Sequence, residues 1–310
     1  MQIFESNYIE NDGVGCVLAF GNFDGVHIGH AYLLQQAKEY ARANNLKFGI
    51  YTFVDSPKFK NANHSVITTL QMRLSYFDYG FSPDFVYLER FDLVKNFTPG
   101  EFVGYVVEKF DCKCAFCGDN FSFGKNAAGS PSELCFLMSN VGRNCVVVDG
   151  LKVDGITVSS TRIKELIQQG NVEKASELLG KPYGFNSKVI HGASLGHTLG
   201  FPTINQVIPD ELIMPQYGVY STIVVIDGKE YMGVTNFGVK PTVCNNAAGA
   251  VAETYIVDFD GDVYDKVIGI CFCKKLRDEK KFSSLDGLRK SISDNVVETR
   301  RYFEEKNEKV

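Results

Sequence analysis

The chain has 310 residues, of which 45% are hydrophobic and 22% are charged, as in globular proteins with a buried core. Its 32 basic and 37 acidic residues give a net charge of −5, which argues against a dedicated nucleic-acid-binding protein. The sequence shows no signal-peptide pattern and no apolar run of the roughly 18 residues that a membrane span needs, so we expect a cytoplasmic protein, and its length suggests two domains.

Strand-like and helix-like segments alternate through the first half of the chain. Short apolar runs predict strands at 16–20, 47–53, 85–88, 113–117 and 144–148. Apolar residues at helical spacing predict helices at 31–43, 70–79, 99–110 and 132–140, followed by two more at 161–169 and 172–179. This alternation predicts an α/β domain with a doubly wound parallel sheet.

Strands and turns dominate the sequence after about residue 183. Predicted strands at 218–226 and 229–237 flank Asp227–Gly228, a strong signal for a two-residue hairpin. Strands at 254–259 and 263–274 flank Asp260–Gly261, which we interpret as a second hairpin, because an EF-hand calcium loop needs its glycine at another position. With a final helix at 284–304, the pattern predicts a mostly-β domain, an antiparallel barrel with a terminal helix. We assign the two domains to residues 1–183 and 184–310.

Nine cysteines raise the question of a metal site or of disulfides. Cys112, Cys114 and Cys117 form one cluster and Cys271 and Cys273 another, both in apolar, strand-like segments. No second C-x-x-C and no histidine pair follows at the spacing of a zinc site, and an odd number of cysteines in a cytosolic chain argues against a disulfide framework. We therefore predict that both clusters are buried free thiols.

The segment GNFDGVHIGH, residues 21–30, lies between the first predicted strand and the first predicted helix. In an open parallel sheet, ligands bind at the carboxyl ends of the strands, where this segment must lie. Its glycines allow a ligand to approach the backbone, and His27 and His30 flank the start of the helix, where unpaired N–H groups favour phosphate. The segment therefore predicts a phosphate-binding site.

A second polar motif, GFPTIN at residues 200–205, lies near the start of the predicted barrel. Pro202 fixes its own φ, and in an extended segment Thr203 and Asn205 point to the same face. A hydroxyl and an amide oxygen on one face suit a hard cation such as Mg²⁺, with ATP phosphates and water as its other ligands.

The H-x-G-H pattern after the first strand is the signature of the nucleotidyltransferases, which have a Rossmann-like fold. The longer segment GNFDGVHIGH resembles the adenylyltransferase half of bacterial riboflavin kinase/FAD synthetases, as do the segments at 118–124, 158–164 and 171–183. This resemblance implies transfer of an adenylyl group from ATP to FMN. It implies catalytic roles for His27, His30 and Asn120, and ATP contacts at Gly21, Asn22, Phe23, Asp24, Ser160, Thr161, Arg162 and Lys164.

The second half of the chain resembles the kinase half of the same enzymes. GFPTIN is similar to their Mg·ATP-binding motif, and ETYIVDF to the strand that begins with their catalytic glutamate, here Glu253; the segments at 236–242 and 276–285 also match. The resemblance implies phosphorylation of riboflavin by ATP, with Glu253 as general base. It further implies ATP contacts at Gly192, Gly196, His197, Gly200 and Pro202, metal ligands Thr203 and Asn205, and flavin contacts at Arg277, Glu279 and Phe282.

Four positions depart from the family pattern, and one of them is Asp55, which stands in place of the first proline of the family's T-F-x-P-H-P segment. Ser56 stands where the family commonly has a histidine, and Ser122 and His197 stand where it often has arginine. Two alternatives to a bifunctional FAD-producing enzyme therefore stay open: a riboflavin kinase with a weak or inactive adenylyltransferase domain, and a non-catalytic flavin sensor. The expected partners are riboflavin, FMN, FAD, ATP and Mg²⁺, with no nucleic acid and no membrane, and we expect a monomer or a weak homo-oligomer.

Overall fold

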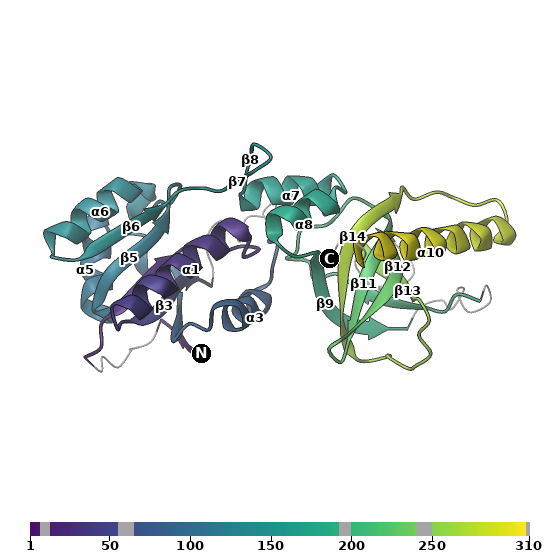
Figure 1. The fold of residues 1–310 in the computed structure, drawn as a ribbon, viewed down its shortest axis with the longest axis horizontal. Coiled ribbons are helices and arrows are strands. Elements are labelled where there is room, and N and C mark those ends of the chain that lie inside the picture. The colour runs from purple at the N-terminus through teal and green to yellow at the C-terminus, as the bar shows by residue number, and fades with distance from the viewer. Residues whose placement is uncertain (7–12, 55–64, 192–199, 240–249, 308–310) are drawn as a thin grey trace. The chain divides into compact units, whose positions relative to one another are not determined.

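The computed structural model describes residues 1–6, 13–54, 65–191, 200–239 and 250–307. The chain divides into two compact units, Met1–Ser160 and Thr161–Val310. Figure 1 shows a sheet with helices in the first unit and a barrel in the second. Within the described ranges, none of the helices has the length and apolar composition to cross a membrane.

The first unit is built on a six-stranded sheet with the order β1-β4-β3-β2-β5-β6, and every neighbouring pair is parallel. Its strands are β1 (Gln2–Glu5), β2 (Cys16–Phe20), β3 (Lys47–Phe53), β4 (Phe85–Glu89), β5 (Cys112–Gly118) and β6 (Asn144–Val148). The parallel sheet confirms the predicted α/β fold. The edge strand β1 was not predicted, because its four residues are mostly exposed and show no buried pattern. A separate two-stranded sheet joins β7 (Lys152–Val153) to β8 (Ile156–Thr157).

Helices cover both faces of this sheet. On one face, α1 (Ile28–Ala43) and α3 (Leu70–Phe81) share a core with β2 and β3. On the other face, α5 (Pro99–Phe110) and α6 (Pro131–Asn140) share a core with β2 and β5. Two short helical segments, α4 (Phe91–Val94) and η1 (Lys125–Ala127), lie in the connections. Helix α1 begins three residues before its predicted start at residue 31, because the His27 side chain caps it.

The strand order determines where a ligand site can form. The chain leaves β2 through α1 to reach β3 on one side, whereas β5 lies on the other side of β2. The connections after β2 and β5 therefore diverge at the carboxyl ends of two neighbouring strands, which is the position where open α/β sheets bind ligands.

The second unit contains a closed barrel with the order β10-β13-β12-β11-β14-β9, in which all neighbouring strands are antiparallel. Its strands are β9 (Tyr183–Ile190), β10 (Thr203–Val207), β11 (Gly218–Ile226), β12 (Lys229–Val239), β13 (Ala250–Ile256) and β14 (Val267–Arg277). The terminal helix α10 (Leu285–Asn307) packs beside β11 and β12, and α8 (Val172–Leu179), which follows α7 (Ser160–Gln168), packs on β9 and β14 (Figure 1). The predicted barrel with its terminal helix is confirmed.

One of the two predicted hairpins is wrong. Asp227 and Gly228 have φ values of 49° and 78° and join the paired strands β11 and β12, as a type I′ turn requires. In contrast, β13 pairs with β10 and β12, and β14 pairs with β9 and β11, so Asp260–Gly261 joins two strands that are not neighbours. Val257 and Val263, on either side of this Asp–Gly pair, are both buried, so the connection is held by packing and does not form a tight turn.

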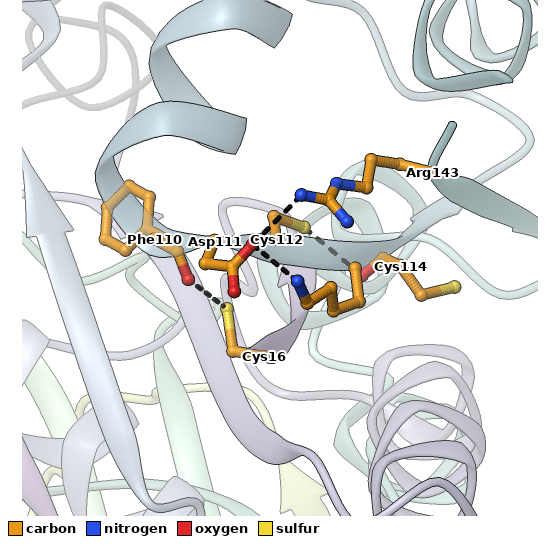
Figure 2. A network of polar contacts seen from close by, with 7 residues as sticks. Cys16, Phe110, Asp111, Cys112, Cys114 and Arg143 are labelled. Atoms are coloured by element: carbon orange, nitrogen blue, oxygen red, sulfur yellow. Dashed lines mark hydrogen bonds and ion pairs between the residues drawn. The ribbon is translucent and has the colours of Figure 1, made fainter. Parts of the chain in front are cut away.

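The cysteines confirm the predicted free thiols and add one disulfide. The thiols at 112, 114, 117 and 273 are buried and free, and the free thiol of Cys271 is partly buried. Figure 2 shows that the Cys112 thiol donates to the Cys114 carbonyl, 3.4 Å away. Burial raises the pKa of the Cys114 thiol to about 12, so it stays protonated at neutral pH. The expectation that disulfides are absent is wrong at one pair: Cys135 on α6 is linked to Cys145 on β6, 10 residues later, because α6 packs against β6.

Candidate active sites

The loop between β2 and α1 has an uncommon backbone. Phe23 and Val26 have φ values of 50° and 41°, and Gly25 has a φ of 84°. Positive φ is rare for residues with a side chain, and most of all for a β-branched residue such as Val26. Such conformations persist only where the surroundings hold them, and they concentrate at functional sites. The surrounding structure must therefore hold this loop in its conformation at the carboxyl end of the sheet.

The histidine pair lies at the amino end of α1. His27 is the N-cap residue, and its Nδ1 accepts a hydrogen bond from the backbone N–H of His30 at 3.2 Å. The two imidazole rings stack with their centroids 3.5 Å apart. Because Nδ1 of His27 accepts this hydrogen bond, Nε2 is the ring nitrogen that carries the proton in the neutral imidazole and can donate to an anion. Together with the helix dipole, the pair provides a site suited to phosphate.

Two of the predicted ATP-binding residues have side chains that stabilise the loop itself. The Asp24 carboxylate is 4% exposed and accepts hydrogen bonds from the backbone N–H groups of Ile67 and Thr68, at 2.8 and 3.2 Å. The Phe23 ring is buried and packs edge-on against His30, with ring centroids 5.2 Å apart. At these two positions, only the backbone remains to face a nucleotide. Gly21 is closely packed as well, because a Cβ there would lie 2.9 Å from the Phe23 ring.

Arg73 is a buried residue near this loop that the sequence analysis missed. It lies on α3, is 3% exposed, and donates from Nη1 to the carbonyl oxygen of Asn22 at 2.6 Å. The sequence could have indicated it, because Arg73 lies four residues before Phe77 and eight before Phe81, on the apolar face of the helix where both phenylalanines are buried.

Two further predicted motifs begin near the same loop. Asn120 is exposed in the turn after β5, the strand beside β2, and Ser122 is exposed two residues later. Ser160 donates from its hydroxyl to the Asp24 carbonyl at 2.9 Å, which connects the start of VSSTRIK to the loop. Beyond it, Thr161 is exposed and Lys164 is half-buried on α7, and Arg162 forms an ion pair with Glu165 at 2.9 Å.

In the barrel, three of the predicted kinase residues lie together. Strands β10 and β13 pair so that Asn205 is directly opposite Glu253. The Thr203 hydroxyl donates to Oε1 of Glu253 at 3.0 Å, and Asn205 is 4% exposed. A hydroxyl, an amide and a carboxylate therefore share one face of two neighbouring strands.

Asn236 extends this polar row onto a third strand. It pairs with Glu253 from β12, on the side of β13 opposite Asn205. Directly paired residues of antiparallel strands have their side chains on the same face, a few ångströms apart. The sequence analysis noted the segment at 236–242 but did not single out Asn236, because its register with Glu253 depends on strand pairing.

The three predicted flavin-binding residues lie at the end of β14 and just after it. The Arg277 guanidinium lies 5.6 Å from the centroid of the Phe282 ring, within the range of a cation–π interaction. Burial lowers the pKa of Arg277 from its ordinary value, and the Glu279 charge opposes that shift. Gly238 on β12 lies against the Glu279 carboxylate, so a side chain at position 238 would displace that carboxylate.

The remaining predicted ATP contacts are only partly visible. Gly192, Gly196 and His197 lie outside the described residues, as does Ser56. Gly200 has a φ of 80°, which favours glycine, and Pro202 is exposed just before β10.

A parallel α/β sheet with a histidine pair at a helix start, followed by a barrel with a Thr–Glu–Asn group, defines a two-domain transferase that uses nucleotides. The family model described as FAD synthetase matches residues 9–162, and the family model described as riboflavin kinase matches residues 179–303. The bifunctional riboflavin kinase/FMN adenylyltransferase of Bacillus subtilis (strain 168) is 30% identical to the chain, and the match covers 95% of each protein. The enzyme of the same description from Escherichia coli (strain K12) is 32% identical, with 93% of each protein covered.

Among solved structures, one described as a macrolide-efflux protein from Streptococcus pneumoniae has the same fold. It matches with a TM-score of 0.87 at 26% identity, over 97% of this chain and 99% of that one. By its sequence relationships over nearly its full length, the chain belongs to the family of bifunctional riboflavin kinase/FMN adenylyltransferases.

Proposed function

We propose that this enzyme makes FAD from riboflavin in two ATP-dependent steps, with one set of residues for each step. In the barrel, riboflavin and ATP give FMN and ADP. In the sheet domain, FMN and ATP give FAD and pyrophosphate. The observation that carries the proposal is the grouping of Thr203, Asn205 and Glu253 on paired strands, in which the Thr203 hydroxyl orients the glutamate.

In the kinase step, Glu253 acts as general base. Its carboxylate accepts the proton of the riboflavin 5′-hydroxyl while that oxygen bonds to the γ-phosphorus of ATP, and the bond to the β-phosphate oxygen breaks to release ADP. The Thr203 hydroxyl donates to Oε1 of Glu253 and so orients the carboxylate that receives the proton. Arg277 and Phe282 would contact the flavin at the end of β14 together with Glu279.

The kinase residues fit a Mg²⁺ ion carried by ATP. A threonine hydroxyl and an asparagine amide are oxygen ligands of the hard type that Mg²⁺ prefers. Thr203 and Asn205 would share the ion with phosphate oxygens of ATP and water. Bound there, Mg²⁺ would neutralise charge on the transferred phosphoryl group.

In the adenylyl-transfer step, the protein positions two anions and stabilises charge. A phosphate oxygen of FMN bonds to the α-phosphorus of ATP, and the bond to the β-phosphate breaks, so pyrophosphate leaves without a covalent enzyme intermediate. His27 and His30 would stabilise the charge on the reacting phosphates, and Asn120 would donate to phosphate. Ser160, Thr161, Arg162 and Lys164 would hold the triphosphate.

The finer organisation is proposed on the same basis. We assign adenylyl transfer to residues 1–183 and the kinase to residues 184–310; α7 and α8 belong to the first by their motifs, although they fall in the second compact unit. The enzyme would act in the cytoplasm as a monomer or a weak homo-oligomer, on small molecules and without nucleic acid.

The test is a product analysis with purified protein. One tube receives riboflavin, ATP and Mg²⁺, a second receives FMN in place of riboflavin, and a third lacks Mg²⁺, before riboflavin, FMN and FAD are separated by chromatography. We expect FAD in the first two tubes and no product in the third. FMN alone in the first tube with no FAD in the second would leave a kinase with a silent adenylyltransferase domain. No product in either would contradict both activities.

A further inference from the structure

Helix α3 carries one charged residue on its buried face. Phe77 and Phe81 pack into the core from this helix, and Arg73 lies on the same side with only 3% of its surface exposed. Arginine is rarely buried to this extent unless its guanidinium is bonded. Its guanidinium donates to a backbone carbonyl, that of Asn22 in the loop before α1.

Arg73 belongs to a segment that forms several hydrogen bonds with the loop between β2 and α1. Thr68 accepts a hydrogen bond from the Gly25 N–H at 3.0 Å, and the backbone N–H groups of Ile67 and Thr68 bind the Asp24 carboxylate. Arg73 completes the set by donating to the Asn22 carbonyl at 2.6 Å. Residues 67–73, which we call the loop clamp, therefore bond to three of the four loop residues between 22 and 25, all except Phe23.

The clamp acts on a loop that needs external support. Phe23 and Val26 both have positive φ, a conformation that neither residue adopts readily by itself. A carbonyl that is bonded to Arg73 also cannot turn toward the amino end of α1, where its negative dipole would repel a phosphate. Arg73 thus favours a loop whose N–H groups, rather than its carbonyls, are available to an anion.

A second contact connects α3 to the histidine pair. The Phe23 ring packs between Phe77 and His30, with centroid distances of 5.7 and 5.2 Å. His30 in turn stacks on His27. A shift of the loop at Asn22 and Phe23 would therefore move the His30 ring.

We propose that Arg73 is a positioning residue for adenylyl transfer, which holds the Asn22 carbonyl and thereby fixes the loop and the His27–His30 pair. The proposal rests on the proposed function of the sheet domain. Arg73 acts through the loop and needs no contact with the substrate. Its loss should therefore lower kcat for FAD formation more than it raises the KM for FMN.

The experiment uses the whole chain and four variants, two at position 73 and one each at positions 143 and 68. In Arg73→Met, kcat for FAD formation from FMN should fall about tenfold or more, the size expected when a hydrogen bond from a charged donor is lost. Arg73→Lys keeps a charged donor and should recover kcat to within about threefold of the wild type. FMN formation from riboflavin, measured in the same samples, should stay unchanged because its residues lie in the barrel.

Arg143→Met is the matched control. Arg143 is a partly buried arginine of the same unit, paired with Asp111 at 3.0 Å, and both residues precede strands, at the opposite end of the sheet from the loop (Figure 2). Its loss should lower the melting temperature but leave kcat for FAD formation intact. If Arg73→Met lowers melting temperature and leaves kcat intact in the same way, Arg73 has a structural role only and the proposal is overturned.

Thr68→Val removes another bond of the loop clamp, the one from the Gly25 N–H to the Thr68 hydroxyl, and nearly preserves side-chain volume. This variant tests the proposal if Arg73→Met does not fold. The same selective fall in kcat supports the proposal, and an unchanged kcat overturns it. Failure of the wild type to make FAD from FMN would instead overturn the proposed adenylyl transfer itself, and this inference with it.

Discussion

At the residue scale, Glu253 has the clearest expected effect. Glu253→Gln keeps the size of the side chain and its contact with the Thr203 hydroxyl but removes the base, so FMN formation should fall about 100-fold or more. FAD formation from supplied FMN should be unaffected. Both rates can be measured by chromatography of the flavins.

The control for this variant is Glu230→Gln, which neutralises an exposed carboxylate on β12 of the same barrel. It should leave both rates unchanged. If Glu253→Gln retained wild-type FMN formation, the glutamate would not be the base, and the polar row of Asn205, Glu253 and Asn236 would need another explanation.

The sequence predicted which residues belong to the candidate sites better than it predicted the contacts that their side chains make. The motifs located Glu253, Thr203 and the two histidines because their local patterns are distinctive. They did not indicate that the Asp24 carboxylate bonds to the backbone at residues 67 and 68, or that Arg73 is buried beneath the loop. Both facts depend on how α3 packs against the sheet, which no local pattern contains.

At the element scale, the two Asp–Gly turns show how similar sequences take different structures. Asp227–Gly228 forms a tight turn between paired strands, and a Cβ at Gly228 would meet no atom within 4 Å. At Gly261, a Cβ would lie 2.8 Å from the Phe259 ring. Gly228 is therefore favoured by its backbone conformation, whereas a side chain at position 261 is disfavoured by the neighbouring Phe259 ring.

Gly228→Ala should therefore destabilise the barrel through backbone strain alone. The φ of 78° lies in the left-handed region, and we expect a loss of about 1 kcal/mol in the free energy of unfolding. Gly228→Asn, which tolerates this region better, should recover most of the loss. Denaturant unfolding of the two variants checks this, and equal stability of Gly228→Ala and wild type would show that the turn relaxes.

At the scale of the whole molecule, the two proposed reactions use different catalytic residues, His27 and His30 for adenylyl transfer and Glu253 for phosphorylation. His30→Ala should lose FAD formation by about 100-fold and keep FMN formation, the reverse of Glu253→Gln. Because FMN is a diffusible product, a mixture of the two variant proteins should convert riboflavin to FAD although neither variant does so alone.

Chromatography of the mixture over time should show FMN rising before FAD. A mixture that makes FMN but no FAD, while Glu253→Gln alone still converts supplied FMN, would show that the FMN formed in the barrel of His30→Ala is not released to solution. Gln35→Ala, an exposed substitution on α1, serves as the control and should retain both activities.

The sequence by itself determined the two kinds of domain, most of the strands and helices, and the identity of the candidate catalytic residues. These features are encoded locally, in hydrophobic periods of two or 3.6 residues and in motifs of ten residues or fewer. Only the tertiary structure decided which strands are neighbours, and with them the separation of β13 from β14. It also decided the bonds from Arg73 to Asn22 and from Thr203 to Glu253, which join residues 51 and 50 positions apart. Such contacts depend on packing and strand register, so a one-dimensional pattern does not specify them.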